Sequence, residues 1–345
     1  MNAVTAVMSG SRSRRRTALI ALAALLAASA LWSLAHGAID IPASQVVGAI
    51  GRWLGGEASS GDDNVILMLR LPRLLLAMLV GSALASGGAT MQGLFRNPLA
   101  DPGLIGVSAG AALGAVAAIV IAGSSGSWLV AVLAFVGGLA ATSLVYVLGR
   151  RRSGVANLLL AGIAINAIAM AGVGLLTYLA SENQLRDLTF WSLGSLGGAS
   201  WTRLATVAPW ILLPLLCLPK AAHALNALLL GESEASLLGF RPERLQPLLV
   251  GLVALAVAAA VAFSGVIGFV GLVVPHLLRM VFGPDHRFLL PASALGGAIL
   301  LVAADALART VVAPGELPIG VLTALVGGPF FLWLLLRRRV GEDVR

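Results

Sequence analysis

The chain has 345 residues, of which 59% are hydrophobic and only 11% are charged. Soluble domains carry about 25% charged residues, and surface-to-volume scaling leaves a water-soluble fold too little interior to hide so much apolar surface. The net charge is +8, and basic residues form three clusters beside hydrophobic runs, at Arg12–Arg16, Arg150–Arg152 and Arg337–Arg339. That position indicates membrane orientation rather than nucleic-acid binding. We therefore expect an all-α polytopic membrane protein with no nucleic-acid partner.

Ten apolar segments rich in Leu, Ala and Gly approach the roughly 20 residues that a helix needs to cross about 30 Å of hydrocarbon. The first could be mistaken for a signal peptide, but it is long and no small-residue cleavage site follows it. We expect one membrane domain over 17–336, a basic segment before it at 1–16 and a basic tail at 337–345. The predicted spans are 17–36, 71–94, 103–122, 128–149, 156–180, 204–219, 246–264, 265–280, 288–311 and 317–336.

An even number of crossings places both termini on the same side of the membrane. Of the 23 Lys and Arg residues, seventeen fall on the side of the termini and six on the other. Because basic residues collect in cytoplasmic loops, we expect both termini in the cytoplasm.

A polar turn, LFRNPLADPGLIG (94–106), follows the second span. Pro98 and Pro102 cannot continue a helix, and each disfavours helical backbone at the residue before it. Asp101 is then free to cap the third helix. On residue pattern alone, the stretch predicts a capped turn between antiparallel helices.

Two later segments are irregular. Residues 246–280 are too long for one crossing and short for two, and FSGVIGFVGLVVP (263–275) has glycines and a proline in its middle. We expect a helix, a reversal near Ser264 and Gly265, and a short, partly unwound return. Irregular backbone at membrane depth is tolerated only beside protein or water, so this segment is a candidate pathway wall.

The second irregular segment is the cytoplasmic loop HALNALLLGESEASLLGFRPERLQ (223–246). Breaks at Gly231 and Gly239 predict two short helices that lie along the membrane. Glu232 and Glu234 would face a negatively charged lipid surface there. We therefore favour a protein partner for this loop.

The sequence lacks the residues of most catalytic sites. The single lysine, Lys220, is in no Gly-rich phosphate-binding loop, and the four histidines are too scattered for a metal site. We expect no enzymatic activity and no cofactor bound by this chain. A proton-coupled secondary transporter would need ionisable residues in mid-membrane. The candidates are Asp305 and Glu316, although we favour a satisfied polar cluster that includes Arg309.

Four stretches together carry a family resemblance, and they are RLPRLLLAMLVGSALASGGATMQGLFRNPLADPGLIGVSAGAALG, LGESEASLLGF, FSGVIGFVGLVVPHLLRM and GELPIGVLTALVGGPFFLWLL. Over about residues 65–336 the chain resembles the FecCD-type permeases of bacterial ABC importers for iron chelates, haem and vitamin B12. The resemblance implies a type II importer permease in the bacterial inner membrane. It implies a homodimer with the substrate path along its axis, two cytoplasmic ATPase subunits that use ATP and Mg²⁺, and a periplasmic substrate-binding protein.

The resemblance also implies roles for individual residues. Docking of the binding protein falls to Arg70, Arg73 and Arg309. Coupling to the ATPase falls to the segment 223–245, with Gly231, Glu232, Glu234 and Gly239. The inner gate falls to Asn97 and Leu99. A second gate uses small hydroxyl residues in the vitamin B12 relative, but here its places hold Val155 and Ala156.

The cargo is predicted from the pathway. QLRDLTFWSLGSLGGASW (184–201) is expected to be an outer loop in which Arg186 faces the cavity, and its guanidinium suits the carboxylates of haem or a siderophore. The fifth and tenth spans, the expected lining helices, are apolar with many small residues. They contain few side chains able to ligate iron axially. The chain most resembles the haem branch, with ferric siderophore and cobalamin as alternatives.

Overall fold

The structure is a computed structural model and describes residues 2–37, 39–56, 61–123, 128–150, 155–312 and 315–342. These residues form helices and no strands. In chain order the helices are α1 (Asn2–Ala35), α2 (Ala43–Gly55), α3 (Gly61–Asn64), the π-helix η1 (Val65–Arg70), α4 (Leu71–Leu94), the 3₁₀-helix η2 (Pro102–Ile105), α5 (Val107–Val120), α6 (Trp128–Gly149), α7 (Val155–Leu179), α8 (Glu182–Leu193), α9 (Trp201–Cys217), the 3₁₀-helix η3 (Leu218–Ala221), α10 (Ala222–Leu230), α11 (Glu232–Leu237), α12 (Pro242–Ser264), α13 (Val270–Phe282), α14 (His286–Thr310) and α15 (Ile319–Glu342).

Seven helical segments of the described chain are long and apolar enough to cross a membrane: those containing α1, α4, α6, α7, α9, α12 and α14. Three shorter apolar helices, α5, α13 and α15, accompany them. Each of the ten predicted spans coincides with one of these ten helices, so the expected architecture is confirmed. The basic N-terminal segment is part of the first helix, which already begins at Asn2.

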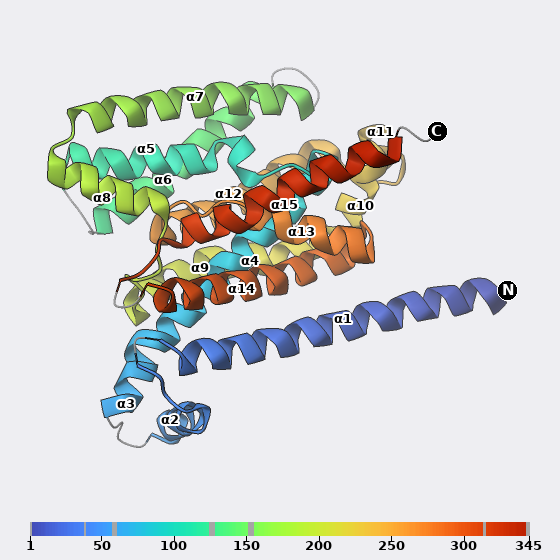
Figure 1. Cartoon of the computed structure of the whole chain (residues 1–345). Coiled ribbons are helices and arrows are strands. Elements are labelled where there is room, and N and C mark those ends of the chain that lie inside the picture. Colours follow the sequence, from blue (N-terminus) through green and yellow to red (C-terminus); the bar gives the residue numbers. More distant parts are fainter. Residues whose placement is uncertain are drawn as a thin grey trace.

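Helix α4 lies at the centre of the bundle and packs against α9, α12, α13 and α14 (Figure 1). Helices α5, α6 and α7 form a group on one side, and α1 lies along α14 on the other. Helices approach closely at glycine: a methyl group at Gly81 would overlap the Gly297 carbonyl, and one at Gly88 would overlap the Gly271 carbonyl. Lipid removes the hydrophobic effect as a force between helices, so the van der Waals packing that such close contact allows helps to hold them together.

The bundle has two distinct ends. The N-terminal end of α1 and the C-terminal end of α15 lie at one end, together with α10 and α11 (Figure 1). We call this the terminal end. Helices α2, α3 and α8 lie at the opposite, distal end. The start of the first described helix and the end of the last therefore lie on one side, as an even number of crossings requires.

The reversal after the seventh span is confirmed. Helix α12 ends at Ser264, residues 265–269 are not α-helical, and α13 begins at Val270. Gly265 has a φ of 69° and Phe269 a φ of 67°. A side chain on Gly265 would also overlap the Trp191 carbonyl, so only glycine fits where the chain turns back.

Two distal segments differ from the prediction. Residues 184–201 were expected to be a loop, but 184–193 belong to α8. This helix begins with a capping box between Ser181 and Gln184. The connection after α1, for which no helix was predicted, contains α2, α3 and a π-helix. Helices α2 and α8 mix polar and apolar residues, so a search for long apolar runs misses them.

Candidate functional site: two polar clusters and the pathway between them

Three arginines and two carboxylates meet at the distal end. Arg73 of α4 pairs with Asp305 of α14 at 2.9 Å and with Glu316 at 2.8 Å. Arg309, one turn after Asp305, pairs with the same carboxylate at 3.1 Å. Asp305 is only 1% exposed, whereas the Glu316 side chain is 43% exposed. The predicted polar cluster is therefore present, and a hydrogen bond from Arg73 lowers the pKa of the Glu316 carboxyl below its ordinary value.

The same cluster holds the distal end of α1. Arg70 donates to the carbonyls of Leu34, at 2.6 Å, and Ile39. Arg309 donates to the carbonyl of Ser33 at 3.2 Å and to its hydroxyl at 2.9 Å. The last carbonyls of a helix lack partners within the helix, and these arginines provide them. The three arginines named for docking thus lie together, each with partners inside the chain.

The turn at 95–101 lies at the terminal end of α4. Arg96 has a φ of 51°, the backbone N–H of Leu99 donates to Asn97 Oδ1 at 3.0 Å, and that of Gly103 donates to Asp101 Oδ1 at 2.7 Å. Asp101 therefore caps η2 rather than α5, which begins later than expected. The side-chain turn at Asn97 keeps the two predicted gate residues in one rigid element.

One side chain connects this turn to the fifth span. Asn166 of α7 donates its Nδ2 proton to the Gly103 carbonyl at 3.0 Å. Its Oδ1 is buried without a hydrogen-bond partner in the structure. The prediction missed Asn166, because a lone asparagine in an apolar run does not reveal which distant backbone group it binds. Of the second gate, Val155 is the first residue of α7, its side chain lies outside the described residues, and Ala156 is exposed.

The predicted cytoplasmic helices are α10 and α11. The chain breaks between them at Gly231, with a φ of 138°, and after them at Gly239, with a φ of 87°. Glu232 accepts a hydrogen bond from Gln246 of α12 at 3.0 Å. The Glu234 carboxylate folds over Gly231. Leu237 is 89% exposed at the end of α11, so this segment presents an apolar tip beside two acidic side chains.

Asp285, which sequence reasoning missed, joins three elements at the terminal end. It accepts hydrogen bonds from Arg15 of α1 at 2.5 Å, from Asn226 of α10 at 2.8 Å and from Arg287 at 2.9 Å. It also caps α14 by accepting from the Arg287 backbone N–H. Burial opposes ionisation, but the hydrogen bonds from Arg287, Asn226 and Arg15 outweigh it and hold the pKa of the Asp285 carboxyl far below its ordinary value.

A cavity of about 510 Å³ lies between α5 and α7 and reaches the side chains of α8. Its wall is mostly apolar, with Asn166, Ser108 and Ser192 as its polar side chains. Arg186 does not line it. The Arg186 side chain is exposed on α8 and donates to Asn183 Oδ1 at 2.8 Å, so its contact with cargo stays a prediction. No group of three or more His, Cys, Asp or Glu side chains among the residues described is arranged to hold a metal ion.

Comparison with known proteins identifies the family to which this arrangement belongs. Residues 25–337 match the FecCD transport family over most of the chain. The chain belongs to this family. It is therefore a membrane-spanning permease of the ABC transporter type, and the family predicted from its motifs is confirmed.

The relatives agree with this assignment. The hemin transport system permease protein HmuU of Yersinia pestis is 53% identical over 282 residues, which cover 80% of this chain and 84% of HmuU. The vitamin B12 import system permease protein BtuC of Klebsiella pneumoniae subsp. pneumoniae is 41% identical, with 94% of this chain and 95% of BtuC covered. A solved inward-facing structure of a metal-chelate type ABC transporter shares 34% identity at a TM-score of 0.83, covering 92% of this chain and 98% of its own.

Proposed function

We propose that this chain is the permease subunit of an importer that carries haem across the bacterial inner membrane. The observation that supports haem is the 53% identity to a hemin permease over most of both chains. The 41% identity to a vitamin B12 permease supports cobalamin as an alternative cargo. The similarity to a metal-chelate type transporter supports ferric siderophores as another. Importers of this kind take energy from separate ATPase subunits, which bind ATP and Mg²⁺, and receive cargo from a periplasmic binding protein.

The terminal end is the cytoplasmic one in this proposal. The basic clusters near both chain ends support this orientation. The exposed apolar tip of α11, with Glu232 and Glu234, suits insertion into a cleft of the ATPase. Because Asn226 of α10 binds Asp285 at the start of α14, a push on α10 and α11 reaches a full-length membrane helix directly.

The distal end receives the binding protein. Carboxylates of the binding protein would compete with Glu316 for Arg73, because Glu316 is exposed. The buried Asp305 would stay between Arg73 and Arg309. Such exchange between exposed charges steers association and makes it salt-dependent. Arg70, Arg73 and Arg309 thus keep their proposed docking role through exchange of one internal ion pair.

A second copy of the chain completes the pathway. Helix α7 leaves apolar side chains exposed along its length, among them Ile163, Ile168, Met170 and Leu175. Helix α15 does the same with Leu325 and Val326. A path between two such surfaces has few polar groups to hold a flat, apolar cargo. The two subunits would rock about their common axis and open it to each side in turn.

A proton-coupled carrier using Asp305 and Glu316 is the competing function. Asp305 lies between two arginines at 2.9 and 3.1 Å, so protonating it would leave two buried cations with only one carboxylate. An uncompensated buried charge costs several kcal/mol, on the order of 3–5. The geometry therefore favours a structural role for Asp305.

Reconstitution tests the proposal. The chain is placed in liposomes with its ATPase and its binding protein, and ATP hydrolysis and uptake are measured with haem, a ferric siderophore or cobalamin. We expect haem to give the largest stimulation and the chain alone to transport nothing. Uptake by the chain without an ATPase would refute the importer, and stimulation by cobalamin alone would refute haem as the cargo.

A further inference from the structure

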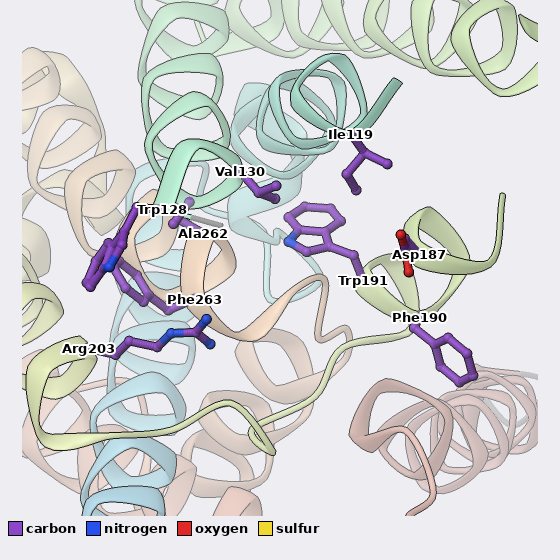
Figure 2. A pocket seen from close by; sticks show the side chains of 10 residues that line it. Ile119, Trp128, Val130, Asp187, Phe190, Trp191, Arg203, Ala262 and Phe263 are labelled. Carbon is purple, nitrogen blue, oxygen red and sulfur yellow. The ribbon is translucent and has the colours of Figure 1, made fainter. Parts of the chain in front are cut away.

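A separate cavity of about 260 Å³ lies at the distal end, where α5, α6, α8, α9 and α12 meet. Figure 2 shows Trp128 and Phe263 on one side of it and Trp191 of α8 on the other. Trp128 and Phe263 are in edge-to-face contact, with ring centroids 5.6 Å apart. Four of the cavity's ten lining residues are aromatic, whereas Trp191 is the one aromatic residue in the lining of the 510 Å³ cavity.

The cavity also contains one cation and one anion. Arg203 of α9 projects its guanidinium from below, and Asp187 lies on the α8 side (Figure 2). Arg203 Nη1 donates to the Gly198 carbonyl at 2.9 Å, which holds the guanidinium at the first turn of α9. Among the described residues, no hydrogen bond or ion pair engages the half-buried Asp187 carboxylate.

The ends of the neighbouring spans indicate that the cavity lies at the level of lipid headgroups. Helix α6 begins at Trp128 and α12 ends at Ser264, so the apolar spans end here, and tryptophan is enriched at this depth. Two turns beyond Trp128 on α6 and Arg203 on α9, Phe135 and Trp210 are in contact, with centroids 5.5 Å apart. Seven residues of helix place that pair roughly 10 Å deeper in the bilayer. Trp210 is partly exposed on the outer surface of α9.

We propose that this cavity binds the headgroup of an aminophospholipid, one that carries both a phosphate and a primary ammonium group. The Arg203 guanidinium binds the phosphate. The Asp187 carboxylate accepts hydrogen bonds from the ammonium, and the indole of Trp191, on the same helix, attracts the same cation. An acyl chain of the lipid runs inward over Phe135 and Trp210.

The pair of charges selects among lipids. A lone arginine would bind any anionic lipid, but Asp187 repels a headgroup that has only negative charge. A quaternary ammonium cannot donate hydrogen bonds to the carboxylate. We therefore expect a primary amine headgroup to bind best, a choline headgroup less well and a glycerol headgroup worst. This inference depends on the chain crossing a membrane and is independent of its cargo.

Native mass spectrometry of the purified chain in defined mixtures of phosphatidylethanolamine, phosphatidylcholine and phosphatidylglycerol tests it. The unmodified chain should retain phosphatidylethanolamine about tenfold more strongly than phosphatidylglycerol, the ratio expected for one charge-assisted hydrogen bond. Equal retention of the three lipids would overturn the proposal, and this arm needs no variant. Inorganic phosphate should not displace the lipid, and if it does, the cavity is a simple anion site.

Two variants assign the charges. Asp187→Asn should remove the preference for the primary amine, and Arg203→Gln should weaken retention of all three lipids. The controls are Glu182→Gln, at the exposed start of α8, and Lys220→Gln, beyond the other end of α9. A preference unchanged in Asp187→Asn, or lost equally in Glu182→Gln, would overturn the assignment.

Discussion

Replacing Asp285 by alanine removes one carboxylate that serves α1, α10 and α14 together. Loss of the α14 cap costs about 1 kcal/mol. The ion pair with the partly exposed Arg15 contributes about 0.5 kcal/mol, and leaving Asn226 without its acceptor costs on the order of 1 kcal/mol. The variant should therefore lose roughly 2–3 kcal/mol of stability. Asp285→Asn keeps an oxygen for the cap and should lose about half as much.

Thermal unfolding of the detergent-solubilised chain, followed by tryptophan fluorescence, measures the stability of Asp285→Ala, of Asp285→Asn and of the unmodified chain. Asp62→Ala is the matched control, because Asp62 is an exposed acid at the distal end. In the reconstituted importer, Asp285→Ala should also reduce cargo-stimulated ATP hydrolysis relative to basal hydrolysis, since α10 is no longer tied to α14. Unchanged melting and unchanged stimulation would refute the reasoning.

The pH dependence has a defined sign. The pKa of Asp285 is lowered by folding from its ordinary 3.8, so the ionised carboxylate stabilises the folded chain above that value. This stabilisation is lost as the pH falls below it. The melting temperature of the unmodified chain should fall between about pH 5 and pH 3, and that of Asp285→Asn should fall less. Parallel curves for the two proteins would contradict the assignment.

Three further tests address other parts of the structure. Arg309→Glu should weaken association with the binding protein, more at low salt than at high, whereas Glu316→Gln should strengthen it by releasing Arg73. The affinity is measured with the binding protein immobilised on a surface, and a change of the same sign in both variants would argue against charge exchange. Gly88→Ala should destabilise the α4–α13 crossing, whereas Gly251→Ala, which has open space, should be neutral or stabilising by up to about 1 kcal/mol; equal melting temperatures would contradict this. Arg186→Ala should slow uptake of haem without changing basal ATP hydrolysis, and an unchanged uptake rate would leave Arg186 as a surface residue.

The membrane helices were predictable because lipid permits few alternatives. An apolar segment in a bilayer must satisfy its backbone within itself, so a long apolar run implies a helix. Glycine made the breaks readable too, at Gly231, Gly239 and Gly265, since each has a positive φ that other residues avoid. The helix α8 could also have been found, because Ser181 and Gln184 have the spacing of a capping box.

The polar contacts between helices were not predictable in the same way. Asp285 binds Asn226 across 59 residues and Arg15 across 270. Asn166 reaches the Gly103 carbonyl across 63 residues. No local pattern reports such pairs, because they depend on how separate helices pack. Asp305 was identified only because a buried acid in an apolar span is rare, and its partner Arg73 lies 232 residues away.

These contacts make α1 and α14 one mechanical unit. At the terminal end Asp285, at the start of α14, holds Arg15 of α1; at the distal end Arg309 of α14 holds the Ser33 carbonyl of α1. A pair of packed helices fixed at both ends resists bending and sliding, so a force on α10 would move the pair as a rigid body. Arg309 belongs also to the proposed docking cluster, where Asp305 connects it to Arg73. The proposed exchange of the Arg73–Glu316 pair would therefore reach α1 through Asp305 and Arg309. In the proposed function, docking and ATPase coupling would then be linked through one helix pair, by a coupling free energy that is typically about 1–3 kcal/mol.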